Sequence, residues 1–163
     1  MNDHPPEPAP TYLQLRSRIL NLDPAEVGLS PTIIAPHVWG VLMETGYAVG
    51  TATLVSLVDG TTSLYYSTGG GMLGSGEYTP VAKASKALVT QAENHLQHMS
   101  STKELPLPEV GQVRFILLTY SGIFTAETSE KTLSSMNHPL SPLYTLGQET
   151  LTQLHLLSEK KRK

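Results

Sequence analysis

The sequence predicts an α+β domain in which an antiparallel sheet of four or five strands is sandwiched by helices. Two pairs of β-rich runs are each joined by a short turn sequence, which is typical of hairpins and therefore of antiparallel strands. Runs with apolar residues at three- and four-residue spacing lie before, between and after these pairs. The predicted order of elements is helix, hairpin, helix, hairpin, helix.

The length of the chain predicts one domain. With 163 residues the chain can bury one sizeable core, and two domains would be unusual. Residues 1–10 contain four prolines and little that could be buried, so we expect a flexible arm there. We place the domain at residues 11–157 and a basic tail at residues 158–163.

Charge and composition exclude several function classes. Residues 160–163 hold four of the 11 Lys and Arg, and without them the net charge of −3 becomes −7 for residues 1–159. An acidic body argues against a phosphate-binding face, so we expect no nucleic-acid partner. The basic tail suits the C-terminal dipole of a helix better than it suits a nucleic-acid or membrane role. The absence of cysteine excludes disulfides and thiolate ligands.

The sequence also lacks the patterns of membrane and secreted proteins. No apolar run approaches the roughly 18 residues that a spanning helix needs, and the first residues do not resemble a signal peptide. We therefore expect a cytoplasmic protein without a membrane partner.

The first predicted element is a short amphipathic helix that starts near Thr11. Its apolar positions recur at helical spacing: Tyr12, Leu15, Ile19 and Leu22. Asp23 then caps about one further turn of helix, which begins at Pro24 and ends at Gly28.

A second helix is predicted from Pro36 to Thr45, with Gly46 as its C-cap. Its apolar residues form one stripe and a neighbouring face: Val38, Val41, Leu42 and Thr45, then Trp39 and Met43. A helix that is apolar around most of its girth is usually buried on two sides. It would lie between the sheet and another helix, or between its own core and a partner chain.

The first hairpin is the clearest local pattern. The runs TATLVSLV and TTSLYYST flank Asp59-Gly60, a dipeptide that favours a type I′ turn. A glycine-rich segment (Gly69–Gly76) follows, and Thr79-Pro80 begins a long helix that ends near Met99. The apolar stripe of this helix is rich in small side chains in its N-terminal half. The stripe consists of Val81, Ala84, Ser85, Leu88, Val89, Ala92, Leu96 and Met99.

A connecting loop over residues 100–111 precedes the second hairpin. Its strands are VRFILLTY and IFTAETSEKTL, joined at Ser121-Gly122, and the first is a near-continuous apolar run that predicts a central strand. Ser141-Pro142 begins the terminal helix, whose apolar residues continue to Leu157.

The glycine-rich segment is the first candidate binding site. Gly69, Gly71 and Gly74 match the spacing of a dinucleotide-binding loop, but the preceding strand is one arm of a hairpin, which argues against that fold. Backbone N–H groups in such a loop could still hold a phosphate or carboxylate. The residues of this anion site would be Gly69, Gly70, Gly71, Gly74, Ser75, Gly76 and Thr79. A structural role for the glycines is favoured, and we expect several of them to have positive φ.

Catalytic and metal sites are not indicated. His95 and His98 are three residues apart on a predicted helix, but a metal would need ligands from elsewhere, and a pair near the helix C-terminus is simpler. The chain has no G-x-S-x-G elbow, and nothing selects the members of a Ser-His-Glu site. We expect no enzyme, no metal and no cofactor.

Two features predict contacts beyond the single core. Tyr65 and Tyr66 are adjacent in a strand and so point to opposite faces of the sheet, one of them core. The stripe of the helix from Pro80 to Met99 is wider than one sheet face requires, so we expect a homodimer near this helix. The expected interface residues are Trp39, Ala84, Ala87 and Leu88, with a place in the core as the first reading for Trp39.

The order of elements resembles the roadblock family of profilin-like domains over residues 36–157. The matching segments are PHVWGVLMETG, ATLVSLVDG, TSLYYSTGG, PVAKASKALVTQAENHL, VRFILLTY, IFTAETSEKTL and a closing helix. Such domains typically have five strands, whereas four are evident here. Either a fifth strand follows the one that opens at Ile123, or the likeness is to the broader profilin-like architecture.

The resemblance implies a non-catalytic module that dimerises and binds other proteins, often small GTPases or their regulators. It implies a dimer interface at residues 80–99 and 113–120, and no catalytic residue to carry over. The expected function is therefore a homodimeric protein-interaction module. The alternative is a sensor that binds a small ligand or an anion in the loop at residues 69–76.

Overall fold

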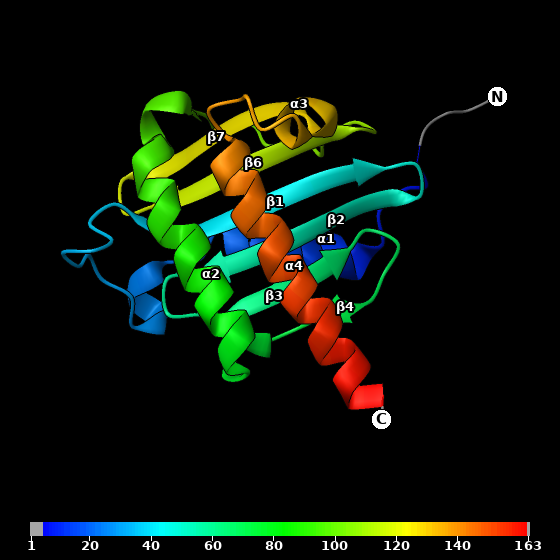
Figure 1. The fold of residues 1–163 in the computed structure, drawn as a ribbon, viewed down its shortest axis with the longest axis horizontal. Coiled ribbons are helices and arrows are strands. Elements are labelled where there is room, and N and C mark those ends of the chain that lie inside the picture. Colours follow the sequence, from blue (N-terminus) through cyan, green and yellow to red (C-terminus); the bar gives the residue numbers. More distant parts are fainter. Residues whose placement is uncertain (1–4, 163) are drawn as a thin grey trace.

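The computed structural model describes residues 5–162, and within them the chain forms one central sheet (Figure 1). Seven antiparallel strands follow the order β4-β3-β2-β1-β6-β7-β5. The strands are β1 (Val38–Tyr47), β2 (Gly50–Leu57), β3 (Thr62–Tyr66), β4 (Gly71–Met72), β5 (Ser100–Ser101), β6 (Gln112–Thr119) and β7 (Gly122–Ser129). The α+β class is confirmed, but the sheet has more strands than the four or five expected.

The segment predicted as a helix from Pro36 to Thr45 is the central strand β1, so that prediction is wrong. β1 pairs with β2 on one side and β6 on the other, and nine of its ten residues are buried. A run that is apolar on every side suits a strand covered on both faces as well as it suits a buried helix, and periodicity does not separate the two. Gly40 and the valines at 38 and 41 favour the strand, because glycine and β-branched residues are weak helix formers.

Both predicted hairpins are confirmed. β2 and β3 flank Asp59-Gly60, and β6 and β7 flank Ser121. β7 ends at Ser129, whose side chain accepts a hydrogen bond from the backbone N–H of Thr132 and so caps the short helix α3 (Glu130–Ser134). The last part of the predicted second strand is therefore helical. Strands β4 and β5, two residues each, lie within the segments predicted as the glycine-rich turn and the connecting loop.

Helices α2 (Thr79–Ala92) and α4 (Ser141–Arg162) cover one face of the sheet and pack against each other (Figure 1). The predicted helix from Pro80 to Met99 is α-helical as far as Ala92 and continues as the 3-10 helix η3 (Glu93–His98). Another 3-10 helix, η2 (Ser75–Glu77), lies in the glycine-rich segment before α2. The fully buried side chains of this α2 face are mostly aliphatic and include Val41, Met43, Leu54, Leu64, Val81, Leu88, Val113, Phe115, Leu117 and Leu143. Most of the apolar core lies here.

A thinner layer covers the opposite face. It consists of α1 (Pro10–Leu20), the 3-10 helix η1 (Pro24–Val27) and the segment 102–111, which contributes Leu105 and Leu107. The residues buried on this α1 face are Tyr12, Ile19, Leu29, Trp39, Leu42, Val55, Leu57, Tyr65, Ile116 and Leu118. The predicted cap is confirmed, because the Asp23 side chain accepts from the N–H of Ala25 and Gly28 closes η1 with φ +76°.

The two ends of the chain differ from their predicted boundaries. Residues 1–4 of the expected arm lie outside the described residues; within the arm, the N–H of Ala9 donates to the Ser67 carbonyl oxygen at 2.7 Å. α4 continues through residues 158–162, so the described part of the basic tail is helical. Across residues 5–162, none of the helices combines the length and the apolar character needed to span a membrane.

Candidate functional site

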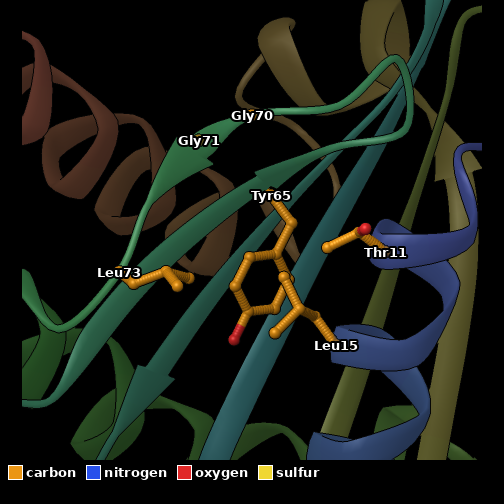
Figure 2. Close-up of a pocket in the computed structure, with 6 residues that line it drawn as sticks. All are labelled: Thr11, Leu15, Tyr65, Gly70, Gly71 and Leu73. Carbon is orange, nitrogen blue, oxygen red and sulfur yellow. The ribbon is translucent and has the colours of Figure 1, made fainter.

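A groove runs along the α1 face between α1 and the sheet edge formed by β3 and β4 (Figure 2). Two hollows of about 220 and 240 Å³ adjoin there, because they share Leu15, Tyr65 and Leu73. The other residues that line them are Thr11, Arg18, Ile19, Leu22, Ser63, Gly70 and Gly71. We call this surface the α1 groove.

The alternation of β3 places Tyr65 in this groove. Leu64 points into the α2 face, so Tyr65 points toward α1, and its ring lies between Leu15 and Leu73 (Figure 2). Tyr66 points the opposite way and is 36% exposed, which confirms that the two tyrosines face opposite sides. Leu73 follows β4 and is 63% exposed. Of the three residues that both hollows share, Leu73 is exposed, Leu15 is half-buried and Tyr65 is only 8% exposed, so Tyr65 forms the floor of the groove.

One buried ion pair holds the helical wall of the groove. Arg16 of α1 donates through Nε and Nη2 to the two carboxylate oxygens of Glu44 in β1, both at 2.7 Å, and Glu44 is completely buried. The same Nη2 also donates to the Leu105 carbonyl oxygen at 2.8 Å. Thr53 donates to Glu44 at 2.8 Å and is hydrogen-bonded to the Tyr12 hydroxyl at 2.7 Å. These bonds join α1, β1, β2 and the 102–111 segment.

Burial and the charges of the Arg16–Glu44 pair shift the pKa values of Tyr12 and Arg16. Burial, together with the negative charge of Glu44, raises the pKa of Tyr12 to about 12. Burial alone would lower the pKa of Arg16, but the hydrogen bonds and charge of Glu44 outweigh it and hold that pKa above its usual value. The cross-strand neighbour of Glu44 in β6 is Arg114, a second cation on the same face. Arg16 therefore stays charged, which keeps Glu44 compensated.

The glycine-rich segment is shaped by backbone geometry. Gly69, Gly70, Gly71 and Gly74 have positive φ, which confirms the expectation for several of these glycines. At Gly71, φ is +143° and a Cβ would clash with the Leu64 carbonyl oxygen across the β3–β4 pair. The glycines therefore have a structural role in the turn that carries β4.

The structure does not bring the seven expected ligand residues together. Gly70 and Gly71 line the α1 groove, whereas Gly74 and Ser75 line a separate hollow with Glu77, Tyr78, Leu157 and Lys161. Gly76 packs against the backbone of Gly60. Gly69 is exposed in the turn, and Thr79 is exposed at the start of α2.

The expected interface residues are mostly internal. Trp39 is 3% exposed on the α1 face, and Leu88 is completely buried on the α2 face. Ala84 is 8% exposed, and with the exposed Ala87 it lines a hollow between α2 and α4. The stripe that motivated a dimer at α2 is thus covered by the sheet and α4. β6 is likewise interior, because β1 and β7 occupy both its edges.

His95 and His37 each contact one polar side chain. His95 is 6% exposed and its Nε2 lies 3.1 Å from the Gln91 amide nitrogen, while burial and the nearby His98 lower its pKa. His37 contacts Glu93, whose carboxylate also accepts the backbone N–H groups of His37 and Val38, both at 2.7 Å. Glu93 thereby fixes the start of β1. Among residues 5–162 no group of three or more His, Asp or Glu side chains is arranged to hold a metal ion.

Sequence reasoning missed the residues that shape the groove. Glu44 is the one charge in a run of apolar residues, and Arg16 lies on the same helical face as Tyr12 and Ile19. Both positions contradict their local pattern, which is a signal of a buried pair. Leu73 carried no comparable signal, because its exposure depends on where α1 lies.

Comparisons with known proteins returned no match: no family model fits the sequence, and neither a curated protein nor a solved structure is significantly similar to the chain. The resemblance to roadblock domains stays a prediction.

Proposed function

We propose that this chain is a non-enzymatic protein-interaction module that binds an apolar segment of a protein chain in the α1 groove. The observation that carries the proposal is the groove itself, where Leu15, Tyr65 and Leu73 meet around two adjoining hollows. Clustered exposed apolar side chains on a folded domain commonly mark a protein-binding surface. An aromatic ring at the centre is typical of the residues that contribute most to such binding.

The walls of the groove support a preformed site. α1 is fixed by the Arg16–Glu44 pair, and the opposite wall is fixed by β3–β4 pairing at Leu64–Met72 and Tyr65–Gly71. A surface that is already shaped loses less conformational entropy when it binds. The groove therefore favours binding without rearrangement of the sheet.

The charge at the rim indicates the chemistry of the partner. Arg18 is the one charged residue among those that line the groove, and its side chain is exposed. A partner segment that combines aliphatic side chains with an acidic residue would match both the hollows and this cation. The roadblock resemblance supports the same function class, with a homodimer and with small GTPases or their regulators as expected partners.

Selection from a random peptide library displayed on phage tests this function. We expect enriched peptides to carry adjacent aliphatic residues and an acidic residue, and to lose binding to the Leu73→Arg and Leu15→Arg variants. Val49→Arg is the matched control, because Val49 is 70% exposed on the β1–β2 turn and does not line the groove. Peptides that bind all variants equally, or a selection without enrichment, would contradict the proposal.

A second candidate is anion binding beside the glycine-rich segment. Here Lys161 of α4 lines the same hollow as Gly74 and Ser75, and Lys160 lies over the Tyr78 ring at 5.4 Å from its centroid. The helix thus brings cations to a loop that has none of its own, although Glu77 opposes an anion there. Thermal unfolding with inorganic phosphate tests it: a stabilisation that Lys161→Gln removes supports this site, and an unchanged midpoint excludes it.

A further inference from the structure

We infer that the α1 groove receives the Ile33–Ile34 turn of a second copy of this chain, so that two copies exchange these turns about a two-fold axis. The inference rests on the proposed function of the groove and names its occupant. It differs from a dimer at α2, because the contacting surfaces lie on the α1 face and at the loop before β1.

The first observation is the exposure of two adjacent isoleucines. Ile33 is 100% exposed and Ile34 is 72% exposed, in the segment between η1 and β1 that projects from the sheet (Figure 1). Single exposed apolar residues are common, but two neighbouring β-branched side chains at the tip of a loop form a contiguous apolar knob. Among residues 5–162 little packs against this knob, so the groove of its own chain does not hold it.

The second observation is that the turn is ordered by its own bonds. The N–H of Thr32 donates to the Ala35 carbonyl oxygen at 3.2 Å, and the N–H of Ala35 donates to the Thr32 hydroxyl at 3.0 Å. Ala35 is 1% exposed and anchors the turn in the domain. Pro31 and Pro36 flank it and restrict the backbone further. The isoleucines are thus held outward before any partner arrives, which reduces the entropy lost on docking.

The knob and the groove are both mainly apolar, and residues of opposite charge lie near them. The groove offers two adjoining hollows of about 220 and 240 Å³ with mostly apolar walls, and the knob offers two aliphatic side chains. The groove carries Arg18, and the exposed acidic residues Asp23 and Glu26 lie in the η1 region, between the groove-lining Leu22 and the knob. A turn from a second copy would bring these acids toward the cation, which adds electrostatic complementarity.

A second copy is favoured over a lipid surface as the occupant. The acidic residues near the turn oppose an anionic membrane, whereas they match the cation of the groove. Each chain carries one knob and one groove, so reciprocal docking of two copies satisfies both at once. Two-fold closure of this kind is the commonest form of self-assembly.

Sedimentation velocity of the full chain tests the inference first. From about 10 µM to about 500 µM, which covers weak protein association, we expect a shift from monomer to dimer. The Ile33→Ser/Ile34→Ser variant should weaken the dimer by much more than about 100-fold, so that no dimer is detected in this range, because the burial of four isoleucines per dimer is lost. Leu73→Arg should weaken it as well, and Val49→Ser should leave it unchanged. A wild-type monomer throughout this range, or a dimer that neither variant weakens, would overturn the inference.

Mixing the two defective variants is the sharper test. The Ile33→Ser/Ile34→Ser chain keeps an intact groove, and the Leu73→Arg chain keeps an intact turn, so their mixture should form a heterodimer with one working contact. One contact binds more weakly than two, so NMR shifts at residues 32–35 of the Leu73→Arg chain, on addition of about 1 mM of the Ile33→Ser/Ile34→Ser chain, are the readout. Unchanged signals at these residues would contradict reciprocal exchange. Cosedimentation with phosphatidylcholine vesicles that depends on Ile33 and Ile34, without self-association, would assign the turn to membranes instead.

The outcome also separates this inference from the proposed function. The Ile33→Ser/Ile34→Ser chain retains Leu15, Tyr65 and Leu73, so peptides selected on the groove should still bind it. Peptide binding with a monomeric wild-type chain would remove only the inference about the second copy. Loss of both would remove the groove as a binding site.

Discussion

The two faces of the sheet are covered in different ways. On the α2 face, two long helices pack over a cluster of fully buried aliphatic residues, and the polar groups there are hydroxyls such as the bonded pair Ser56 and Ser85. On the α1 face, one helix of 11 residues and a loop are fastened by a buried ion pair, and a groove remains beside them. The comparison teaches that the α2 face provides most of the core, whereas the α1 face combines partial cover with a groove.

The first prediction breaks the ion pair of the α1 face. Arg16→Met leaves the Glu44 carboxylate buried without its partner, and we expect a loss of about 3–5 kcal/mol in the free energy of unfolding. The double variant Arg16→Met/Glu44→Leu should recover more than half of this loss, because the uncompensated charge is gone. Urea denaturation measures both. A loss below about 1 kcal/mol for Arg16→Met would mean that the pair does not hold α1.

The second prediction removes volume from the α2 face. Leu88 is completely buried in α2, so Leu88→Ala should lower the free energy of unfolding by about 3 kcal/mol through lost burial and a cavity. Unlike the loss caused by Arg16→Met, this loss cannot be recovered by a second substitution that removes a buried charge, because Leu88→Ala leaves no charge without its partner. The exposed Ala87→Ser on the same helix is the control, expected within about 0.5 kcal/mol of the wild type.

The third prediction uses pH to distinguish the faces. The pKa of Tyr12 is about 12 in the folded chain and about 10 when unfolded, so between these values the unfolded state releases a proton that the folded state keeps. Stability should therefore fall as pH rises from 10 to 12, by about 1 kcal/mol per pH unit from this group. Tyr12→Phe removes this contribution. Equal slopes for the wild type and Tyr12→Phe in urea titrations above pH 10 would contradict it.

The fourth prediction concerns the buried hydroxyls of the α2 face. Ser85 contacts the hydroxyls of Ser56 and Thr62, and Thr62 also donates to the Gly60 carbonyl oxygen. Ser85→Ala should cost about 1 kcal/mol, because neutral hydrogen bonds are lost and no charge is stranded. Thermal unfolding checks this. A cost as large as that of Arg16→Met would remove the contrast between the faces.

The sequence was sufficient for elements with a local pattern. The hairpin at Asp59-Gly60 was predictable because a turn dipeptide separates two β-rich runs. The helix after Pro80 was predictable from its first-turn proline and its apolar spacing, although Thr79 lies within the helix and does not cap it. β1 was not predictable in this way, since its identity depends on pairing at both edges: with β2, which follows it directly after a short turn, and with β6, which is distant in sequence. β4 and β5 are too short to show any period.

The candidate site was predictable only in fragments. The positive φ of Gly71 followed from its place in a glycine-rich turn, but that turn forms only one wall of the groove. The other wall depends on how Arg16 reaches Glu44, 28 residues away along the chain. The apolar stripe of α2 was expected near a dimer axis, but the sheet and α4 of the same chain pack against it.

The most direct measurement of the central claim is a concentration series of amide spectra by NMR on the wild-type chain. The claim is that the α1 face binds and the α2 face is core. As the concentration rises from about 50 µM to about 1 mM, toward the weak end of protein association, we predict shifts in α1, in residues 63–73 and in residues 32–35. Shifts concentrated in the exposed positions of α2 and α4 instead would place self-association on the opposite face and contradict the account.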